Sequence, residues 1–278
     1  MIPFNFEYYK PSTVEEAVEL FNKFKSQGRK PIYYGGGTEF ISMARMHNRY
    51  ADAVIDIKGI PECNIHGIKD GNLIMGSAIT LTQISEANYF PLLGYTVRRI
   101  ADHTIQDKIT LGGNLIGTII YKEAILPLLL SNSNIVLYGN MGRRTVPILD
   151  IYNQKILLDE DEVLVKVITE EKFLTLPYRH VKRTKHEKID YPLITMASIK
   201  DGDKVLIAFS GLCDYPIRPL EVEEILNDSS LAKEEKVKKS IENIPGRILN
   251  DLSGSSEFRK FILSDMLIRI FEKFEEVS

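Results

Sequence analysis

Two glycine-rich segments are the parts of this sequence that could bind a charged ligand. The first, at residues 33–40, reads YYGGGTEF, and the second, at residues 110–114, reads TLGGN. Glycine has no Cβ atom, so consecutive glycines let a ligand approach the backbone N–H groups closely. If a helix begins just after such a loop, the positive end of its dipole also faces the ligand. This combination binds phosphate or diphosphate without lysines, and the Thr38 hydroxyl would add a donor.

Neither segment matches an established nucleotide motif, because the sequence has no GxGxxG and no GxxxxGK[ST] pattern. A tight strand-to-helix turn without any ligand would explain the first loop alone. The second loop favours binding, since two such loops could hold one extended dinucleotide from both ends. Asn114 would offer that ligand both a donor and an acceptor.

Composition excludes several classes of protein. The 278 residues are 44% hydrophobic and 26% charged, which is typical of folded chains and not of disordered or collagen-like ones. The formal net charge of −3 gives nucleic acid no electrostatic attraction. No apolar stretch is long enough to span a bilayer, and residues 1–11 lack the pattern of a signal peptide. We therefore expect a cytoplasmic protein without a membrane or nucleic-acid partner.

The residues that usually bind metals are sparse. Cys63 and Cys213 are the only cysteines, too few for a four-cysteine iron–sulfur or zinc site. The five histidines show no HExxH motif, and we see no convincing catalytic triad. We expect no metal site and no catalytic side chain, so redox chemistry would need a bound organic cofactor.

Apolar periodicity predicts an α+β chain in three sections. The first section has helices at 12–26, where Ser12 would be the N-cap, and at 38–46, with parallel strands at 31–34 and 53–57. The second has a hairpin that turns at Asp70-Gly71, helices at 81–87, 91–102 and 121–130, and strands at 135–137, 145–147 and 162–168. The third has a hairpin at 193–209 and helices at 221–226, 230–243 and 256–275. The buried face of the last helix is predicted to hold Phe258, Phe261, Ile262, Met266, Leu267, Ile270 and Phe271.

The two loops, together with three other segments, resemble the FAD-binding (medium) subunit of the molybdenum hydroxylases. This is the family of the xanthine dehydrogenase and carbon monoxide dehydrogenase flavoproteins. GGGTEF at 35–40 and TLGGNLIGT at 110–118 carry the resemblance. Residues 3–17, 183–194 and 254–259 are similar to the family's opening, the start of its C-terminal domain and its closing motif. The five segments occur in the family's order along nearly the whole chain.

The resemblance implies a PCMH-type FAD-binding fold of two α+β subdomains, at 1–57 and 58–172. A small α+β C-terminal domain with an antiparallel sheet and helices would follow at 173–278. FAD is the implied cofactor. The first loop would wrap its diphosphate, and the second would reach the diphosphate and the ribityl chain. The implied cofactor-binding residues are Tyr33, Tyr34, Gly35, Gly36, Gly37, Thr38, Glu39, Phe40, Thr110, Gly112, Gly113, Asn114, Glu123, Leu164 and Lys182.

Three of these positions carry alternatives. Glu123 stands where the family usually has an aspartate that hydrogen-bonds the polyol or sugar, and it could instead be a helix-surface acid. Leu164 could be plain strand core. Lys182 could be a solvated lysine in the basic run 179–188, and Lys185 is close enough to take its place.

The function that the resemblance implies is an electron relay. A partner small subunit with two [2Fe–2S] clusters would pass electrons to FAD, which would hand a pair to NAD⁺ or another acceptor. A molybdopterin large subunit would hydroxylate the substrate, with xanthine or a related purine preferred. Two alternatives remain open: a stand-alone FAD-dependent oxidoreductase on the same scaffold, and a flavin-free assembly subunit.

Overall fold

The computed structural model describes residues 2–186 and 189–275, and the chain forms two compact units. Unit 1 consists of Met1–Tyr89, Asp102–Gly117 and Asn132–Glu171. Unit 2 consists of Phe90–Ala101, Thr118–Ser131 and Lys172–Ser278. Each unit contains helices and sheet, which confirms the α+β class. The division into domains at 1–57, 58–172 and 173–278 stays a prediction.

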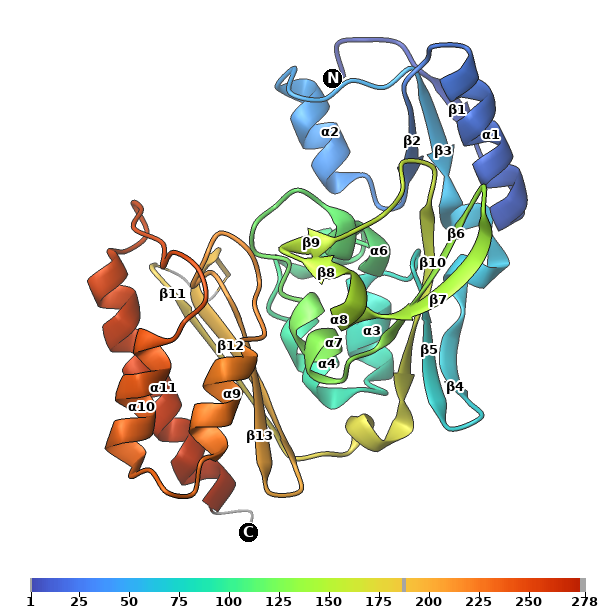
Figure 1. The fold of residues 1–278 in the computed structure, drawn as a ribbon. Coiled ribbons are helices and arrows are strands. Elements are labelled where there is room, and N and C mark those ends of the chain that lie inside the picture. The colour runs from blue at the N-terminus through green and yellow to red at the C-terminus, as the bar shows by residue number, and fades with distance from the viewer. Residues whose placement is uncertain (1, 187–188, 276–278) are drawn as a thin grey trace. The chain divides into compact units, whose positions relative to one another are not determined.

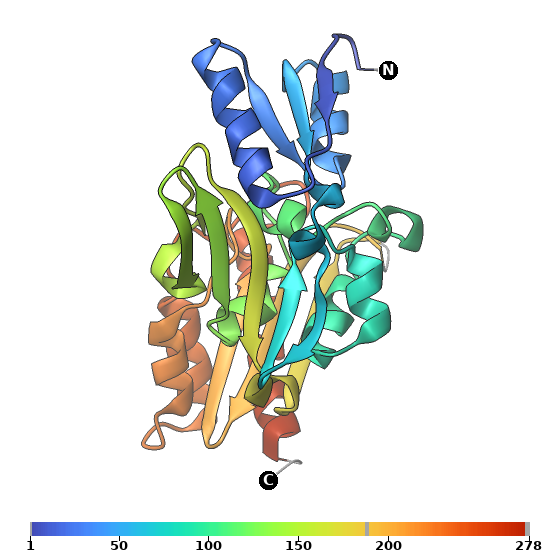
Figure 2. The same ribbon diagram turned by 90° about the vertical axis from the view of Figure 1, so that its right-hand side faces the viewer.

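Unit 1 begins with a three-stranded parallel sheet in the order β1-β3-β2. The strands are β1 (Glu7–Tyr9), β2 (Pro31–Tyr34) and β3 (Ala53–Asp56), and Figure 2 shows α1 (Val14–Ser26) and α2 (Thr38–Arg45) on opposite faces of this sheet. The predicted parallel pairing of the second and third strands is confirmed. Strand β1 was not predicted, because three residues are too short to show a period.

Helix α1 follows the predicted apolar period, but its N-cap differs by one residue. Thr13, and not Ser12, caps the helix by accepting the Glu16 N–H at 3.1 Å. The Ser12 N–H and hydroxyl donate instead to the Glu16 carboxylate, at 2.8 and 3.1 Å. The buried face is Val14, Ala17, Val18, Phe21 and Phe24, as predicted.

The second sheet of unit 1 is antiparallel, in the order β4-β5-β10-β6-β7. Its first hairpin turns at Asp70 and Gly71, whose φ angles of 50° and 72° are those of the predicted primed turn. The other elements of unit 1 are η1 (Ile57–Gly59), η2 (Pro61–Asn64), β4 (His66–Lys69), β5 (Asn72–Gly76), α3 (Leu81–Ala87), α5 (His103–Gln106), α6 (Leu111–Ile116), β6 (Asn134–Gly139), β7 (Gly142–Pro147), α8 (Ile148–Ile151), β8 (Tyr152–Asn153), β9 (Lys155–Ile156) and β10 (Val163–Glu170).

Unit 2 is built on the antiparallel sheet β11-β12-β13. Figure 1 shows α9, α10 and α11 on one face of this sheet and α4 and α7 on the other. Strand β11 covers much of the basic run 179–188, in which a solvated Lys182 was one alternative. The elements are α4 (Pro91–Val97), α7 (Ile125–Leu130), β11 (Tyr178–Thr184), β12 (Pro192–Asp201), β13 (Lys204–Ser210), α9 (Leu220–Asn227), α10 (Lys233–Glu242) and α11 (Ser256–Glu275), and the short helix η3 (Glu171–Leu174) precedes β11.

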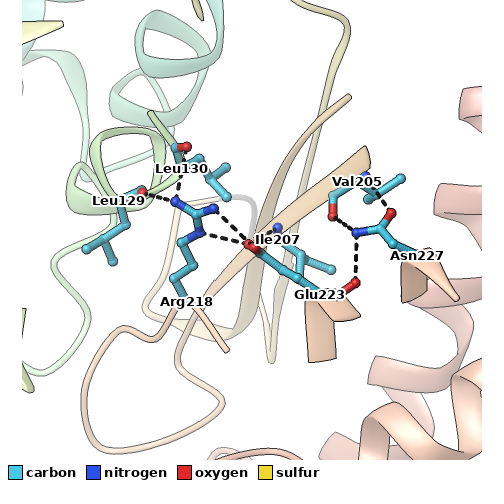
Figure 3. A network of polar contacts seen from close by, with 7 residues as sticks. All are labelled: Leu129, Leu130, Val205, Ile207, Arg218, Glu223 and Asn227. Atoms are coloured by element: carbon cyan, nitrogen blue, oxygen red, sulfur yellow. Dashed lines mark hydrogen bonds and ion pairs between the residues drawn. The ribbon is translucent and has the colours of Figure 1, made fainter. Parts of the chain in front are cut away.

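A buried ionic network connects α7, β13 and α9 within unit 2 (Figure 3). The Arg218 guanidinium donates to both oxygens of Glu223, at 2.8 and 3.0 Å, and to the Leu129 carbonyl at 2.8 Å. Glu223 also accepts the Ile207 N–H at 2.9 Å. Asn227 completes the network by bonding both the N–H and the carbonyl of Val205, at 2.8 and 2.9 Å. The cation therefore satisfies carbonyls at the C-terminal end of α7, where a helix dipole favours positive charge.

Some of the helices predicted in unit 2 need correction. The helix predicted at 91–102 ends at Val97, and Ala101 has a left-handed φ of 54°. The helix predicted at 121–130 begins only at Ile125, because Lys122 has a left-handed φ of 37°. In α11, Phe258 and Phe261 are 47% and 68% exposed, so the predicted buried face is wrong at these two residues. The residues of α11 in the core are Leu263, Met266, Leu267, Ile270 and Phe274.

Candidate functional site

The first glycine loop joins β2 to α2 in unit 1. Gly37 is the N-cap of α2, with a left-handed φ of 70°, and a Cβ there would lie 2.1 Å from the Tyr34 ring. Gly37 has no side chain that could cap the helix, and the N–H groups of a first helical turn have no acceptor within the helix itself. N–H groups at the start of a helix are typical donors to a phosphate or another anion. The sequence therefore predicted correctly that a helix begins directly after the loop.

The second loop is the start of the short helix α6. Thr110 is its N-cap, and the Thr110 hydroxyl accepts the Gly113 N–H at 3.3 Å. A Cβ on Gly112 would lie 2.7 Å from Ser77 Cβ, whereas one on the exposed Gly113 would meet only Thr110 Oγ1, at 2.9 Å. Gly112 is thus required for packing, while Gly113 keeps an open backbone surface.

The two loops lie against each other inside unit 1. The Gly36 N–H donates to Thr110 Oγ1 at 3.4 Å. A Cβ on Gly35 would lie 2.5 Å from Thr110 Oγ1, and one on Gly36 would lie 1.6 Å from the Lys108 carbonyl oxygen. These two glycines therefore allow the loops to meet, and a side chain at either position would push them apart. The structure brings together the loops that the sequence placed at one ligand.

The residues around the loops fit a polar, anionic ligand. The Asn114 Oδ1 atom is buried and has no hydrogen-bond partner among the described residues. An unsatisfied buried acceptor is costly, and a ligand hydroxyl or amino group would satisfy it. Together with the uncapped start of α2, Asn114 gives unit 1 both donors and an acceptor for a phosphorylated ligand.

The remaining residues of the first loop have structural contacts of their own. Tyr33 stacks on Phe21 with ring centroids 4.8 Å apart, and its hydroxyl donates to the Asp161 carbonyl at 2.7 Å. The Glu39 carboxylate pairs with Arg49 at 3.4 Å. Phe40 is buried in a small core cluster. The structure thus presents the backbone of this loop, and most of its side chains hold the loop in place.

Lys58, which the sequence analysis did not single out, contacts the first loop. Its ammonium donates to the Gly35 carbonyl at 2.7 Å, pairs with Asp56 at 2.8 Å and lies 4.5 Å from the centre of the Tyr34 ring. The position of Lys58 could have been inferred from the parallel pairing of the strands, because this pairing sets Tyr34 opposite Asp56 at the ends of β2 and β3. Residues just beyond those ends, Gly35 and Lys58 among them, then lie side by side.

Glu123 and Lys182 form a buried ion pair in unit 2. Lys182 Nζ lies 2.9 Å from Glu123 Oε2, and the exposed fractions of the two side chains are 1% and 5%. Lys182 also donates to the Arg99 carbonyl at 2.8 Å, and Thr195 donates to Glu123 Oε1 at 2.6 Å. Burial raises the pKa of Glu123, against the opposing effect of the Lys182 ammonium. Both side chains are thus satisfied within unit 2, and their contact with a cofactor stays a prediction.

His180 lies on the same strand as Lys182 and is also buried. Neither of its ring nitrogens has a hydrogen-bond partner within residues 2–186 and 189–275. Its ring packs edge-on against Tyr95 with centroids 5.2 Å apart. Burial, reinforced by the charges of Arg99 and Lys182, lowers the pKa of His180 to about 3. The imidazole is therefore neutral at physiological pH.

Leu164, predicted as an apolar contact, is 1% exposed on β10 of unit 1. It pairs with Leu137 just before an irregularity in the ladder between β10 and β6. Across the described segments, no group of three or more His, Cys, Asp or Glu residues could hold a metal ion. None of the helices in those segments is both long and apolar enough to cross a membrane.

Comparison with known families identifies the class of protein to which this fold and these loops belong. The family model described as the FAD binding domain in molybdopterin dehydrogenase matches residues 4–169. The chain belongs to this family, and the prediction of FAD as its cofactor is confirmed at this level. The matched range includes both glycine loops, Glu123 and Leu164, whereas Lys182 lies beyond it.

Two relatives are named as the FAD-subunit and the medium chain of dehydrogenases. The chain is 22% identical over 250 residues to the nicotinate dehydrogenase FAD-subunit of Eubacterium barkeri, which covers 83% of this chain and 82% of that one. It is 30% identical over 176 residues to the carbon monoxide dehydrogenase medium chain of Hydrogenophaga pseudoflava, 60% of this chain and 59% of that one. A solved structure of carbon monoxide dehydrogenase from H. pseudoflava has the same fold, with a TM-score of 0.82 at 24% identity over 97% of this chain and 96% of that one.

Proposed function

We propose that this chain is the FAD-binding electron-transfer subunit of a molybdopterin-dependent hydroxylase. FAD would accept electrons from [2Fe–2S] clusters of a partner subunit and deliver them in pairs to NAD⁺ or another acceptor. The observation that carries this proposal is the meeting of the two glycine loops at Thr110, inside the range that matches the FAD-binding family.

The proposed roles follow from the contacts of unit 1. The uncapped first turn of α2 would donate N–H groups to the FAD diphosphate. Thr110 would hold the two loops at a fixed separation, and Asn114 Oδ1 would accept a hydrogen bond from the cofactor. Glu123, Leu164 and Lys182 are proposed as further contacts on the resemblance alone. None of these residues is proposed to transfer a proton, so the chain's task is to bind and orient the flavin.

Partners and substrate are proposed from the relatives. Their names, FAD-subunit and medium chain, describe one component of an enzyme with several chains. We propose a small [2Fe–2S] subunit and a large molybdopterin subunit as partners, in the cytoplasm. The proposed substrate of the whole complex, xanthine or a related purine, is a nitrogen heterocycle like the nicotinate in the name of one relative.

The first test is to purify the chain alone, saturate it with FAD and record its absorption spectrum. We expect a yellow protein that releases FAD on denaturation. It should oxidise NADH with an artificial dye, yet hydroxylate no purine until the two partner subunits are added. Purine turnover by the isolated chain would instead indicate a stand-alone oxidoreductase. A protein that takes up no FAD would leave the assembly-subunit alternative.

A further inference from the structure

Both ends of one peptide group in the first glycine loop are held by side chains from elsewhere in unit 1. The group joins Gly35 to Gly36. Its carbonyl oxygen accepts a hydrogen bond from Lys58 Nζ at 2.7 Å, and its N–H donates to Thr110 Oγ1 at 3.4 Å. A peptide group is planar and rigid, so two bonds to its opposite ends fix its orientation. Without Lys58, the peptide would keep the long bond to Thr110 but lose the shorter of these two hydrogen bonds.

The lysine is itself held in place. Its ammonium pairs with Asp56 Oδ2 at 2.8 Å, and Asp56 Oδ1 accepts the backbone N–H of Lys58 at 2.9 Å. The Tyr8 hydroxyl donates to the same carboxylate. Asp56 is only 2% exposed, and the pairing outweighs the effect of its burial, so the pKa of Asp56 stays below its usual range. Asp56 is therefore ionised at neutral pH and keeps Lys58 beside the loop.

We propose that Lys58 is a positioning residue for the diphosphate-binding loop, acting through the Gly35 carbonyl. This inference rests on the proposed FAD site. A carbonyl oxygen turned toward a diphosphate would repel it, whereas the same oxygen bonded to Lys58 is directed to a cation. Since Asp56 balances the charge of Lys58, the lysine orients the loop more than it adds positive charge to the site. Glycine alone would leave this loop free to adopt several conformations.

The test compares Lys58→Met, which keeps the length and removes the charge, with Lys58→Arg, which restores a donor. Lys69→Met, an exposed lysine on β4 of the same unit, is the control. The affinities of the purified chain for FAD and for riboflavin, which has no phosphate, are measured by flavin fluorescence. Hydrogen exchange of residues 35–37 is followed in the absence of flavin.

We expect Lys58→Met to weaken FAD binding about tenfold, the size of one hydrogen bond to a charged group. Riboflavin affinity should stay unchanged, exchange at 35–37 should accelerate, and Lys58→Arg should recover most of the FAD affinity. If Lys58→Met binds FAD like the Lys69→Met control, the positioning role is overturned while the FAD site stands. If the unaltered chain takes up no FAD at all, the proposed function and this inference fail together.

Discussion

Thr110 and Gly36 lie 74 positions apart in the chain, yet the Thr110 hydroxyl accepts the Gly36 N–H at 3.4 Å. The same oxygen accepts the Gly113 N–H at 3.3 Å. One hydroxyl therefore joins the two glycine loops of unit 1 and caps α6 as well. We therefore expect the separation of the loops to depend on this atom.

Replacement of Thr110 tests this dependence. Thr110→Val keeps the shape but removes the acceptor, so both N–H groups lose their partner. We expect FAD affinity to fall about tenfold and stability to fall by about 1 kcal/mol, the usual effect of a lost N-cap. Thr110→Ser retains the oxygen, so its losses of FAD affinity and of stability should each be less than about a third of those of Thr110→Val. Equal behaviour of the two variants in FAD titration and urea unfolding would contradict the role of the hydroxyl.

The glycines of unit 1 should differ in their tolerance of alanine. A Cβ on Gly36 would overlap the Lys108 carbonyl, so Gly36→Ala should destabilise unit 1 by more than about 2 kcal/mol and abolish FAD binding. Gly67 on β4 has no atom within 4 Å of an added Cβ, and Gly67→Ala should change stability by less than about 0.5 kcal/mol. Thermal unfolding of the two variants gives the comparison, and a stable Gly36→Ala protein would be inconsistent with the contact of the loops.

Removing one partner of the Glu123–Lys182 pair should lower the free energy of unfolding more than replacing both partners together. Glu123→Gln or Lys182→Met leaves one buried group without its partner, and we expect a loss of about 3–5 kcal/mol in urea unfolding. The double variant Glu123→Met, Lys182→Met should be more stable than either single variant. The resemblance further predicts that the folded double variant binds FAD at least about tenfold more weakly. Unchanged FAD affinity would remove both residues from the predicted site.

His180 should make unit 2 sensitive to mild acid. Its pKa is about 3 in the folded chain, compared with about 6.5 when unfolded, so between these pH values the unfolded chain binds more protons. The free energy of unfolding should therefore decrease as the pH falls below about 6.5, by up to about 1.4 kcal/mol per pH unit. His180→Phe, which keeps a ring beside Tyr95, should remove this contribution between pH 7 and 5. Urea unfolding at a series of pH values measures this contribution. If the free energy of unfolding changes equally with pH in both proteins, the prediction is wrong.

Local patterns predicted much of the fold. The apolar period of α1 and the Asp70-Gly71 turn depend on neighbouring residues only, and both were predicted correctly. The glycine loop before α2 was also visible, because strand, glycines and helix follow one another directly in the chain. The proximity of Lys58 to Gly35 was also within reach, since parallel pairing of β2 and β3 brings the ends of these strands together.

The features that were predicted wrongly or missed depend on contacts between segments far apart in the chain. The alternative that Lys182 is solvated within its basic run is wrong, because Glu123 on another stretch of the chain pairs with it in the core of unit 2. Phe258 and Phe261 fit the helical period of α11, yet Leu263 and Phe274 take the buried positions. The contact between Gly36 and Lys108 could not be predicted either, because local sequence patterns do not indicate which loops meet.

The assembly of unit 2 from three stretches has a consequence for synthesis on the ribosome. Every residue of α7, from Ile125 to Leu130, is buried, and the strands that it packs against belong to the stretch after residue 171. A nascent chain that has completed all of unit 1 therefore still exposes this leucine-rich segment until most of the C-terminal stretch has been translated. A stalled or truncated chain that ends near residue 180 should be retained by chaperones or degraded, although its glycine loops are already complete.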